Sequence, residues 1–155
     1  METEKITNTV KQILTEYLDQ KELRKTPERF AILDEIYRKE GHFDADELYE
    51  SMRKRNFRVS RATIYNTLDV LLDCQLIRKH QFGENLARFE KSYGFKQHDH
   101  LICSDCNKIM EFCDPRVHNI QQMIESFYGF NLTDLSLNFY GNCMKKGCRE
   151  KANTM

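Results

Sequence analysis

The sequence has no long hydrophobic run, no leader-like start and no net charge. No stretch approaches the roughly 18 apolar residues that span a bilayer, and residues 1–5 lack the basic-then-apolar layout of a secretory signal. Basic and acidic residues number 24 each, which excludes nonspecific polybasic wrapping of nucleic acid but leaves room for a local basic footprint. We therefore expect a soluble, cytoplasmic protein with no membrane association.

The composition is that of a folded core, and it supplies six thiols. A length of 155 residues predicts one or two small domains. Apolar residues make up 40% and charged residues 31%, which excludes a disordered tail. Because the cytosol keeps thiols reduced, six cysteines argue against a disulfide scaffold and favour metal binding.

The first half of the chain follows the element order of a winged helix-turn-helix. Apolar residues recur at helical spacing over 5–20, and three capping residues predict three further helices. Two short strands joined by a Gly-Glu-Asn turn then predict a hairpin. The capping residues are Thr26, Asp44 and Ser60, and the strands are 76–82 and 86–91. We expect a DNA-binding domain over residues 1–91.

The second half, after a linker at 92–97, predicts a small α/β domain over residues 98–155. Two strands flank a cysteine-containing turn, a helix follows, and a last strand is expected over 132–139. The helix begins after Asp114 and ends at Gly129. Such a domain is too small to be stable alone, so we expect dimerisation through a sheet edge or helix face. The predicted fold class is α+β: an N-terminal winged helix-turn-helix domain followed by a small α/β dimerisation domain.

A basic segment leads into the fourth predicted helix. From Arg53 to Arg61 there are five basic residues and no acidic one. Helical spacing places Arg61 and Tyr65 opposite the apolar stripe, with Asn66 beside them, and such side chains suit phosphates and base edges in a major groove. The alternative is a solvated basic face on an ordinary helical bundle. The candidate DNA contacts are Arg24, Lys25, Arg58, Arg61, Thr63, Tyr65 and Asn66.

Four cysteines form two closely spaced pairs. Cys103 and Cys106 make a C-x2-C pair, and Cys143 and Cys148 make a C-x4-C pair. Four thiolates fit tetrahedral zinc with no open position, so the predicted site is structural. It would contribute folding energy to a small domain. The alternative is free buried thiols.

Nitrogen and oxygen ligands gather near the same segment. His98 and His100 stand two apart on a predicted strand, so both imidazoles point to one side. Glu90 lies in the second strand of the predicted hairpin, Glu111 lies in the strand after the cysteine turn, and His42 lies in the first domain. Imidazole with carboxylate suits Fe(II), Mn(II), Co(II) or Zn(II). Spacing alone does not bring His42 or Glu90 to the histidines, and ordinary surface polar groups are the alternative.

Five short motifs are spread over most of the chain. They are RKTPER at Arg24–Arg29, GHFDADELY at Gly41–Tyr49, SRATIY at Ser60–Tyr65, HDHLIC at His98–Cys103 and YGNC at Tyr140–Cys143. In combination they resemble the ferric uptake regulator family of metal-dependent repressors, from about residue 21 to residue 150.

The resemblance implies a function and a set of site residues. It implies a homodimer, with a tetramer left open, that binds a palindromic operator in double-stranded DNA and represses iron-uptake genes with Fe(II) as co-repressor. It carries the family's DNA-contact tyrosine onto Tyr65 and its structural Zn(II) onto the four paired cysteines. The family's regulatory metal site maps onto His42, Glu90, His98, His100 and Glu111.

The chain departs from the family pattern at a further metal site near the dimerisation sheet. Of the usual ligands only Asp99 is kept. Gln97 and Leu135 stand where histidines are common, and His118 stands where a glutamate is common. We therefore predict that this extra site is absent, or weak and rebuilt from Asp99 and His118.

Several sensing functions, and two outside the family, compete with iron sensing. The peroxide-sensing branch tends to use aspartate where Glu90 and Glu111 stand, and the zinc-sensing branch usually brings in a cysteine, so the glutamates favour iron sensing. Peroxide, zinc or manganese sensing stays the alternative, because the ligand types do not discriminate Fe(II) from Mn(II) or Zn(II). A metal-dependent hydrolase needs an open metal position and a general base, and it gives the basic helix no role. A zinc-ribbon interaction module does not explain His42. We expect no enzyme activity.

Overall fold

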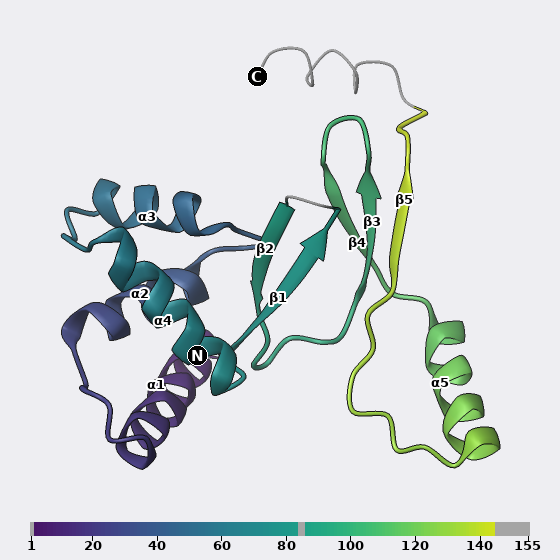
Figure 1. Cartoon of the computed structure of the whole chain (residues 1–155), viewed down its shortest axis with the longest axis horizontal. Coiled ribbons are helices and arrows are strands. Elements are labelled where there is room, and N and C mark those ends of the chain that lie inside the picture. Colours follow the sequence, from purple (N-terminus) through teal and green to yellow (C-terminus); the bar gives the residue numbers. More distant parts are fainter. Residues whose placement is uncertain (1, 84–85, 145–155) are drawn as a thin grey trace. The chain divides into compact units, whose positions relative to one another are not determined.

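The computed structural model describes residues 2–83 and 86–144 of the chain. The chain divides into two compact units, Met1–Lys96 and Gln97–Met155 (Figure 1). The division falls within the segment 92–97 that the sequence suggested as a linker. No helix in the described part of the chain combines the length and the apolar character needed to cross a membrane.

Four helices make up most of the first unit. They are α1 (Glu2–Gln20), α2 (Pro27–Arg38), α3 (Ala45–Lys54) and α4 (Arg61–Asp73). The side chains of Thr26, Asp44 and Ser60 accept hydrogen bonds from backbone amides of the first turns of α2, α3 and α4, as the sequence predicts. At α3 the cap is reciprocal, because Glu47 also accepts from the backbone amide of Asp44.

A two-stranded hairpin completes the first unit. Strands β1 (Ile77–Phe82) and β2 (Leu86–Lys91) pair antiparallel, with His80 opposite Arg88 and Arg78 opposite Glu90. The loop between α2 and α3 joins this hairpin, since Phe43 and Phe89 exchange backbone hydrogen bonds of 2.9 and 2.7 Å. The winged helix-turn-helix order is therefore present, and the loop before α3 is fixed to β2.

The core of the first unit is built from the apolar stripes of its helices and the base of the hairpin. Leu14, Leu33, Leu48 and Leu68 come from one helix each, and all have exposed fractions of 1% or less. Burying a leucine of this kind stabilises the fold by about 1.5–3 kcal/mol. Because α4 contributes its buried stripe to this core, the opposite face of α4 lies in solvent.

The second unit is a three-stranded sheet with one helix. The central strand β3 (Asp99–Cys103) pairs antiparallel with β4 (Ile109–Phe112) and parallel with β5 (Asn138–Gly141). Helix α5 (Pro115–Tyr128) is capped by Asp114 and ends at Gly129, whose φ of 70° is the left-handed conformation that glycine adopts easily. Figure 1 shows α5 beyond one end of the sheet rather than across its face.

The last strand differs from the expected one. It begins at Asn138, whereas the alternation of leucines suggested a strand over 132–139. Before it, the backbone amide of Leu132 donates to the side chain of Glu125, and that of Leu135 donates to the side chain of Asp134. These carboxylates satisfy amides that a strand would have used for its ladder, so sheet pairing starts later.

Candidate metal centres and DNA-facing helix

Three cysteines of the second unit lie together at one end of the sheet. Cys103 ends β3, Cys106 lies in the turn that follows, and Cys143 comes just after β5. The Sγ atoms of Cys103 and Cys143 are 3.2 Å apart, and the three sulfur atoms lie within 4.8 Å of one another. Cys148, the fourth predicted ligand, lies outside the described residues. Three thiolates at this spacing suit a tetrahedral Zn(II) ion.

Backbone and side-chain hydrogen bonds hold these cysteines in place. The amide of Cys103 donates to Lys108 at 2.9 Å, and Asn107, at φ 57°, donates to the carbonyl of Cys103 at 2.9 Å. Across the sheet, Asn142 donates from Nδ2 to Asp105 Oδ1 at 3.0 Å. The turn and the segment after β5 are therefore tied together independently of a metal.

The two other described cysteines are unsuited to this cluster. Cys74 packs against the core of the first unit, and burial raises the pKa of its thiol. Cys113 is exposed after β4 and belongs to none of the candidate metal groups in the described residues.

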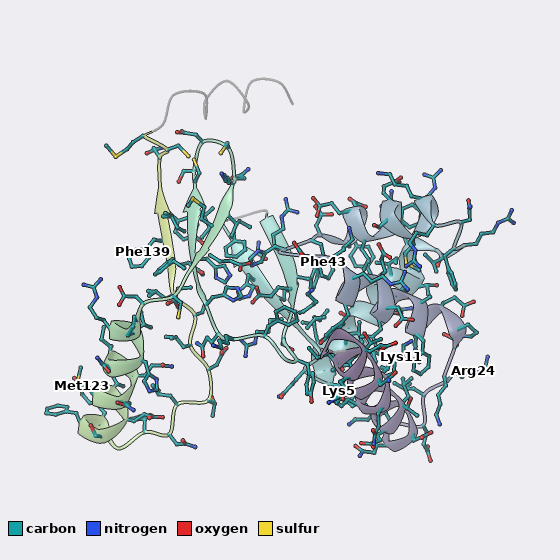
Figure 2. The ribbon with its side chains drawn as sticks, turned by 180° about the vertical axis from the view of Figure 1, so that it is seen from behind. Lys5, Lys11, Arg24, Phe43, Met123 and Phe139 are labelled. Atoms are coloured by element: carbon teal, nitrogen blue, oxygen red, sulfur yellow. The ribbon has the colours of Figure 1, made fainter. Side chains whose placement is uncertain are left out.

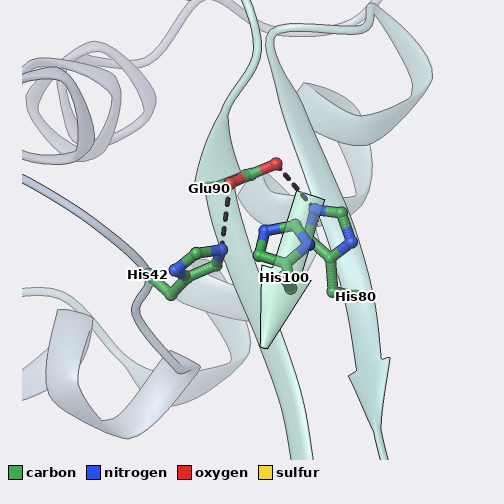
Figure 3. A group of neighbouring side chains, drawn as sticks. All are labelled: His42, His80, Glu90 and His100. Carbon is green, nitrogen blue, oxygen red and sulfur yellow. Dashed lines mark hydrogen bonds and ion pairs between the residues drawn. The ribbon is translucent and has the colours of Figure 1, made fainter. Parts of the chain in front are cut away.

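A second group of metal-binding side chains lies in the first unit and joins His42, His80 and Glu90. Figure 3 shows the Glu90 carboxylate linked to both imidazoles. His42 Nε2 is 3.0 Å from Glu90 Oε2, and His80 Nε2 is 2.7 Å from Glu90 Oε1. The backbone bridge between Phe43 and Phe89 sets His42 beside Glu90, because His42 directly precedes Phe43 and Glu90 directly follows Phe89. Nitrogen and oxygen donors thus converge on β2.

His80 is a candidate ligand that reasoning from the sequence missed. A signal for it exists in the hairpin, whose register places His80 diagonally across from Glu90 on the same face. Predicting that register requires the exact position of the turn between the strands. The proximity of His80 to Glu90 can be inferred only after the two strands have been aligned.

A third group lies in the second unit and contains His98, His100 and Glu111. His98 Nε2 is 3.7 Å from Glu111 Oε1, and the centroids of the His98 and His100 rings are 5.0 Å apart. Glu111 lies directly opposite His100 in the pairing of β3 with β4. Each unit therefore presents imidazole and carboxylate groups at distances that a divalent ion could join.

The residues suggested for an extra metal site are placed differently. Asp99 is buried at the start of β3, whereas His118 is on α5, with Nε2 3.1 Å from the amide nitrogen of Gln122. Gln97 donates from Nε2 to the carbonyl oxygen of Leu135 at 3.4 Å. Neither Asp99 nor His118 belongs to a candidate metal group among residues 2–83 and 86–144, so the expectation of a weak or absent site stays a prediction.

Helix α4 presents a polar face to solvent. Tyr65 is 53% exposed, and Arg61 and Asn66 are exposed beside it, whereas Ile64 and Leu68 on the opposite side are buried. This is the arrangement that the helical spacing predicts, and it leaves the tyrosine hydroxyl and the asparagine amide accessible to a ligand.

Two of the predicted DNA contacts on α4 are engaged within the protein. Arg61 pairs with Asp46 of α3 and lies over the Tyr49 ring, 4.4 Å from its centroid. Thr63 contributes to the cap of α4, with Oγ1 2.8 Å from Ser60 Oγ. Arg61 is therefore oriented by α3, while its side chain remains 56% exposed.

The remaining basic candidates lie at the surface. Arg58 precedes α4 and is exposed. Lys25 pairs with Asp19 at 2.5 Å, and Arg24 points away from the protein before α2 (Figure 2). The charge of Lys25 is therefore partly balanced by Asp19, whereas Arg24 and Arg58 present exposed guanidinium groups at the surface.

An apolar face of the second unit is also exposed. Leu101 lies between Met110 and Phe139 in the pairing of the three strands, and each is between 41% and 52% exposed. Figure 2 labels Phe139 on this sheet and Met123 on α5. An apolar surface of this kind, carried by a sheet and a helix, is typical of a subunit interface.

Comparison with known proteins identifies what this arrangement resembles. Residues 20–140 match the model of the ferric uptake regulator family. The peroxide-responsive repressor PerR of Staphylococcus epidermidis is 32% identical over 131 residues, covering 84% of this chain and 85% of that protein. Among solved structures, the Pseudomonas aeruginosa ferric uptake regulator with manganese has a TM-score of 0.74 at 29% identity, covering 84% of this chain and 98% of that one.

A more distant structure supports the fold alone. The Helicobacter pylori ferric uptake regulator, whose structure has three functional metal-binding sites, reaches a TM-score of 0.79 at 24% identity. The match covers 92% of this chain and 93% of that one, so both units have counterparts in it.

Proposed function

The chain belongs to the ferric uptake regulator family of metal-responsive, DNA-binding transcriptional regulators, and we propose that it is an iron sensor within that family. Fe(II) would be its co-repressor and iron-uptake genes its targets, and it would act in the cytoplasm as a binding protein rather than an enzyme. The observation that carries this proposal is the presence of an imidazole–carboxylate pair in each unit, His42 with Glu90 and His98 with Glu111.

The proposed regulatory site takes ligands from both units. His42 and Glu90 would contribute from the first unit, and His98, His100 and Glu111 from the second. A divalent ion held by all five would restrict the orientation of one unit relative to the other. Fe(II), Mn(II), Co(II) and Zn(II) all accept such ligands, so cellular supply selects the ion. The thiolate cluster of Cys103, Cys106, Cys143 and Cys148 would hold a permanent structural Zn(II).

Restricting the two units would control DNA binding. In a homodimer, or a tetramer built from dimers, two α4 helices would insert their Arg61 and Tyr65 faces into half-sites of a palindromic operator about one helical turn or a multiple apart. Arg24, Lys25 and Arg58 would meet phosphates, and Thr63 and Asn66 would lie near base edges. Moving the population from 1:99 to 99:1 in favour of the binding arrangement requires roughly 5.5 kcal/mol of preference for it.

Peroxide sensing is the second candidate, favoured by the similarity to the staphylococcal peroxide-responsive repressor. Glutamates at positions 90 and 111 argue against it, because the peroxide-sensing branch tends to use aspartate there. Peptide mass after treatment of the Fe(II)-loaded protein with peroxide separates the two: an iron sensor keeps its mass, whereas a peroxide sensor gains one oxygen on His42 or His98.

Operator binding by matched variants tests the proposal. A duplex would be selected from random DNA with the Fe(II)-loaded protein under anaerobic conditions, and gel shifts would compare Fe(II), Mn(II), Zn(II) and chelator. We expect His98→Ala to lose the stimulation by metal while the dimer stays folded. Tyr65→Ala should instead weaken binding under every condition without changing metal content. Normal binding by His98→Ala in chelator would contradict the proposal.

A further inference from the structure

We propose that His80, together with His42 and Glu90, forms a three-ligand metal site contained entirely in the first unit. The inference rests on the proposed function and adds to it a ligand that the five regulatory residues do not include. Its consequence is that the DNA-binding unit takes up a divalent ion by itself, before the second unit contributes its own donors.

The spacing of the three side chains fits a single ion. Nitrogen and oxygen ligands lie about 2.0–2.2 Å from ions such as Zn(II), which places neighbouring ligand atoms about 3 Å from one another. The two imidazole nitrogens are 3.0 and 2.7 Å from the oxygens of Glu90, and the ligand atoms of all three residues lie within 4.8 Å of one another. Only small side-chain movements are needed to accept an ion.

The site is held by the framework of the first unit. His42 is fixed by the backbone bridge from Phe43 to Phe89, and His80 and Glu90 belong to the paired strands of the hairpin. Phe82 lies against both imidazoles, stacked on His80 at 5.5 Å between ring centroids and edge-on to His42 at 5.8 Å. Because the aromatic ring and the strands fix the histidines, little ordering is left to oppose metal binding.

The three groups are also screened from water. The exposed fractions of the side chains are 6% for His42, 7% for Glu90 and 14% for His80. A carboxylate this sheltered from water needs a positive partner or hydrogen bonds, and a divalent ion bound between the imidazoles would supply such a partner. Two imidazoles and one carboxylate are a ligand set that Fe(II), Co(II) and Zn(II) accept, and it leaves coordination positions open for further donors.

A site of this kind separates metal uptake from the control of DNA binding. His42, His80 and Glu90 would hold the ion weakly at first, and the donors of the second unit would then strengthen the binding. The affinity of the first step, set in part by His80, would determine the metal concentration at which the regulator begins to respond.

The test uses Co(II) and the full-length, zinc-loaded protein with the imidazoles of His98 and His100 removed. In His98→Ala/His100→Ala protein we expect one Co(II) per chain to bind, seen as visible absorption without the near-ultraviolet band of a thiolate ligand. Adding His80→Gln to this background should weaken Co(II) binding at least about tenfold. Adding His118→Gln, a histidine on α5 outside the cluster, is the matched control and should change nothing.

Two further comparisons separate a ligand from a positioning residue. Glutamine at position 80 keeps a hydrogen-bond donor for Glu90, whereas His80→Ala removes it. If His80 is a ligand, both variants lose Co(II) affinity while thermal unfolding shows that His80→Gln stays folded. Full affinity in His80→Gln, or no Co(II) binding in the double variant, would overturn the proposal. Operator binding by the unmodified protein, measured in parallel, reports on the proposed function separately, because its failure leaves the Co(II) result intact.

Discussion

The two units of this chain are stabilised in different ways. The first unit contains a core cluster of buried apolar side chains drawn from four helices and the hairpin, with Leu14, Leu33 and Leu68 almost wholly enclosed. Among the described residues of the second unit, the buried apolar ones are Ile102 and Cys103, and no residue of α5 is buried. The first unit buries its apolar side chains against one another, whereas the second unit leaves most of its apolar side chains exposed.

The difference shows where the second unit must obtain its stability. Fixing a residue costs about 1–2 kcal/mol of backbone entropy, and the buried side chains of a sheet this small offset little of that cost. Two further sources of stability are suggested by the structure. One is the thiolate cluster at one end of the sheet, and the other is a partner packed against Leu101, Met110 and Phe139. We therefore expect a metal and a partner subunit to contribute to the folding of the second unit, and we expect the core of the first unit to form without them.

Removing one thiolate should have the largest effect on the second unit and little effect on the first. We expect Cys106→Ser to lose structural zinc and to unfold the second unit while the first unit stays folded. Apparent zinc-binding free energies in small zinc domains are about 10–16 kcal/mol, which is as large as the whole stability of an ordinary domain, about 5–15 kcal/mol. Zinc content and hydrogen exchange of β3 and β5, compared with α2 and α4, would measure the effect.

A neighbouring cysteine provides the control for this experiment. Cys113 follows β4, is exposed and belongs to no candidate metal group in the described residues, so Cys113→Ser should keep both zinc and protection from exchange. Full protection of β3 in Cys106→Ser protein without zinc would show that the sheet is stable by itself.

Local features of the fold could be predicted from the sequence. Thr26, Asp44, Ser60 and Asp114 each cap the helix that follows them, because a cap depends on residues only two or three positions away. The buried stripe of α4 follows equally from the helical period. The strand expected at 132–139 was wrong in its start, because side chains of Glu125 and Asp134 compete for its backbone amides.

The candidate metal site could be predicted only in part. The sequence separates His42 widely from Glu90, and the backbone bridge from Phe43 to Phe89 that brings them together has no local signal. The family resemblance supplied that pair. It did not supply His80, whose approach to Glu90 depends on the register of the hairpin.

A pair of truncations, one in each unit, sharpens the comparison. Leu33 in α2 is fully buried and Ile120 in α5 is 53% exposed. Leu33→Ala should lower the free energy of unfolding by about 2–5 kcal/mol, because it removes buried contacts and leaves a cavity. Ile120→Ala should change the stability of the isolated protomer by less than about 0.5 kcal/mol. It should instead raise the dimer dissociation constant, since α5 contributes to the open apolar surface.

Denaturant unfolding and sedimentation would measure these two effects. Unfolding curves recorded well below the dimer dissociation constant give the stability of the protomer, and sedimentation over a range of concentrations gives the dissociation constant. Equal destabilisation of the protomer by both truncations would mean that α5 packs within its own chain as closely as α2 does.

The smallest expected effect concerns the polar groups that the first unit satisfies internally. Burial by itself raises the pKa of Glu35, but hydrogen bonds from Arg55 at 2.6 Å and Ser51 at 2.8 Å outweigh it, and the net pKa lies below the ordinary value. A carboxyl with a lowered folded-state pKa stabilises the fold above its unfolded pKa, and this stabilisation is lost as the pH falls through the folded-state value.

Arg55→Met should therefore lower stability at pH 7, and the difference from the unmodified chain should shrink as the pH falls and Glu35 becomes protonated in both proteins. The expected loss is about 1 kcal/mol, at the low end of the cost of leaving a buried acceptor short of a partner, because the Arg55 side chain is 45% exposed. Arg53→Met is the control, since Arg53 pairs with the exposed Glu50 at 3.2 Å and such surface pairs contribute close to nothing. Thermal unfolding from pH 7 to pH 3 measures both variants. The unmodified chain should lose the stabilisation from Glu35 as the pH falls through the lowered pKa, so its profile and that of Arg55→Met should converge toward pH 3. The Arg53→Met profile should overlie that of the unmodified chain at every pH. Coincident profiles for all three proteins would mean that Glu35 is not held by Arg55 in solution.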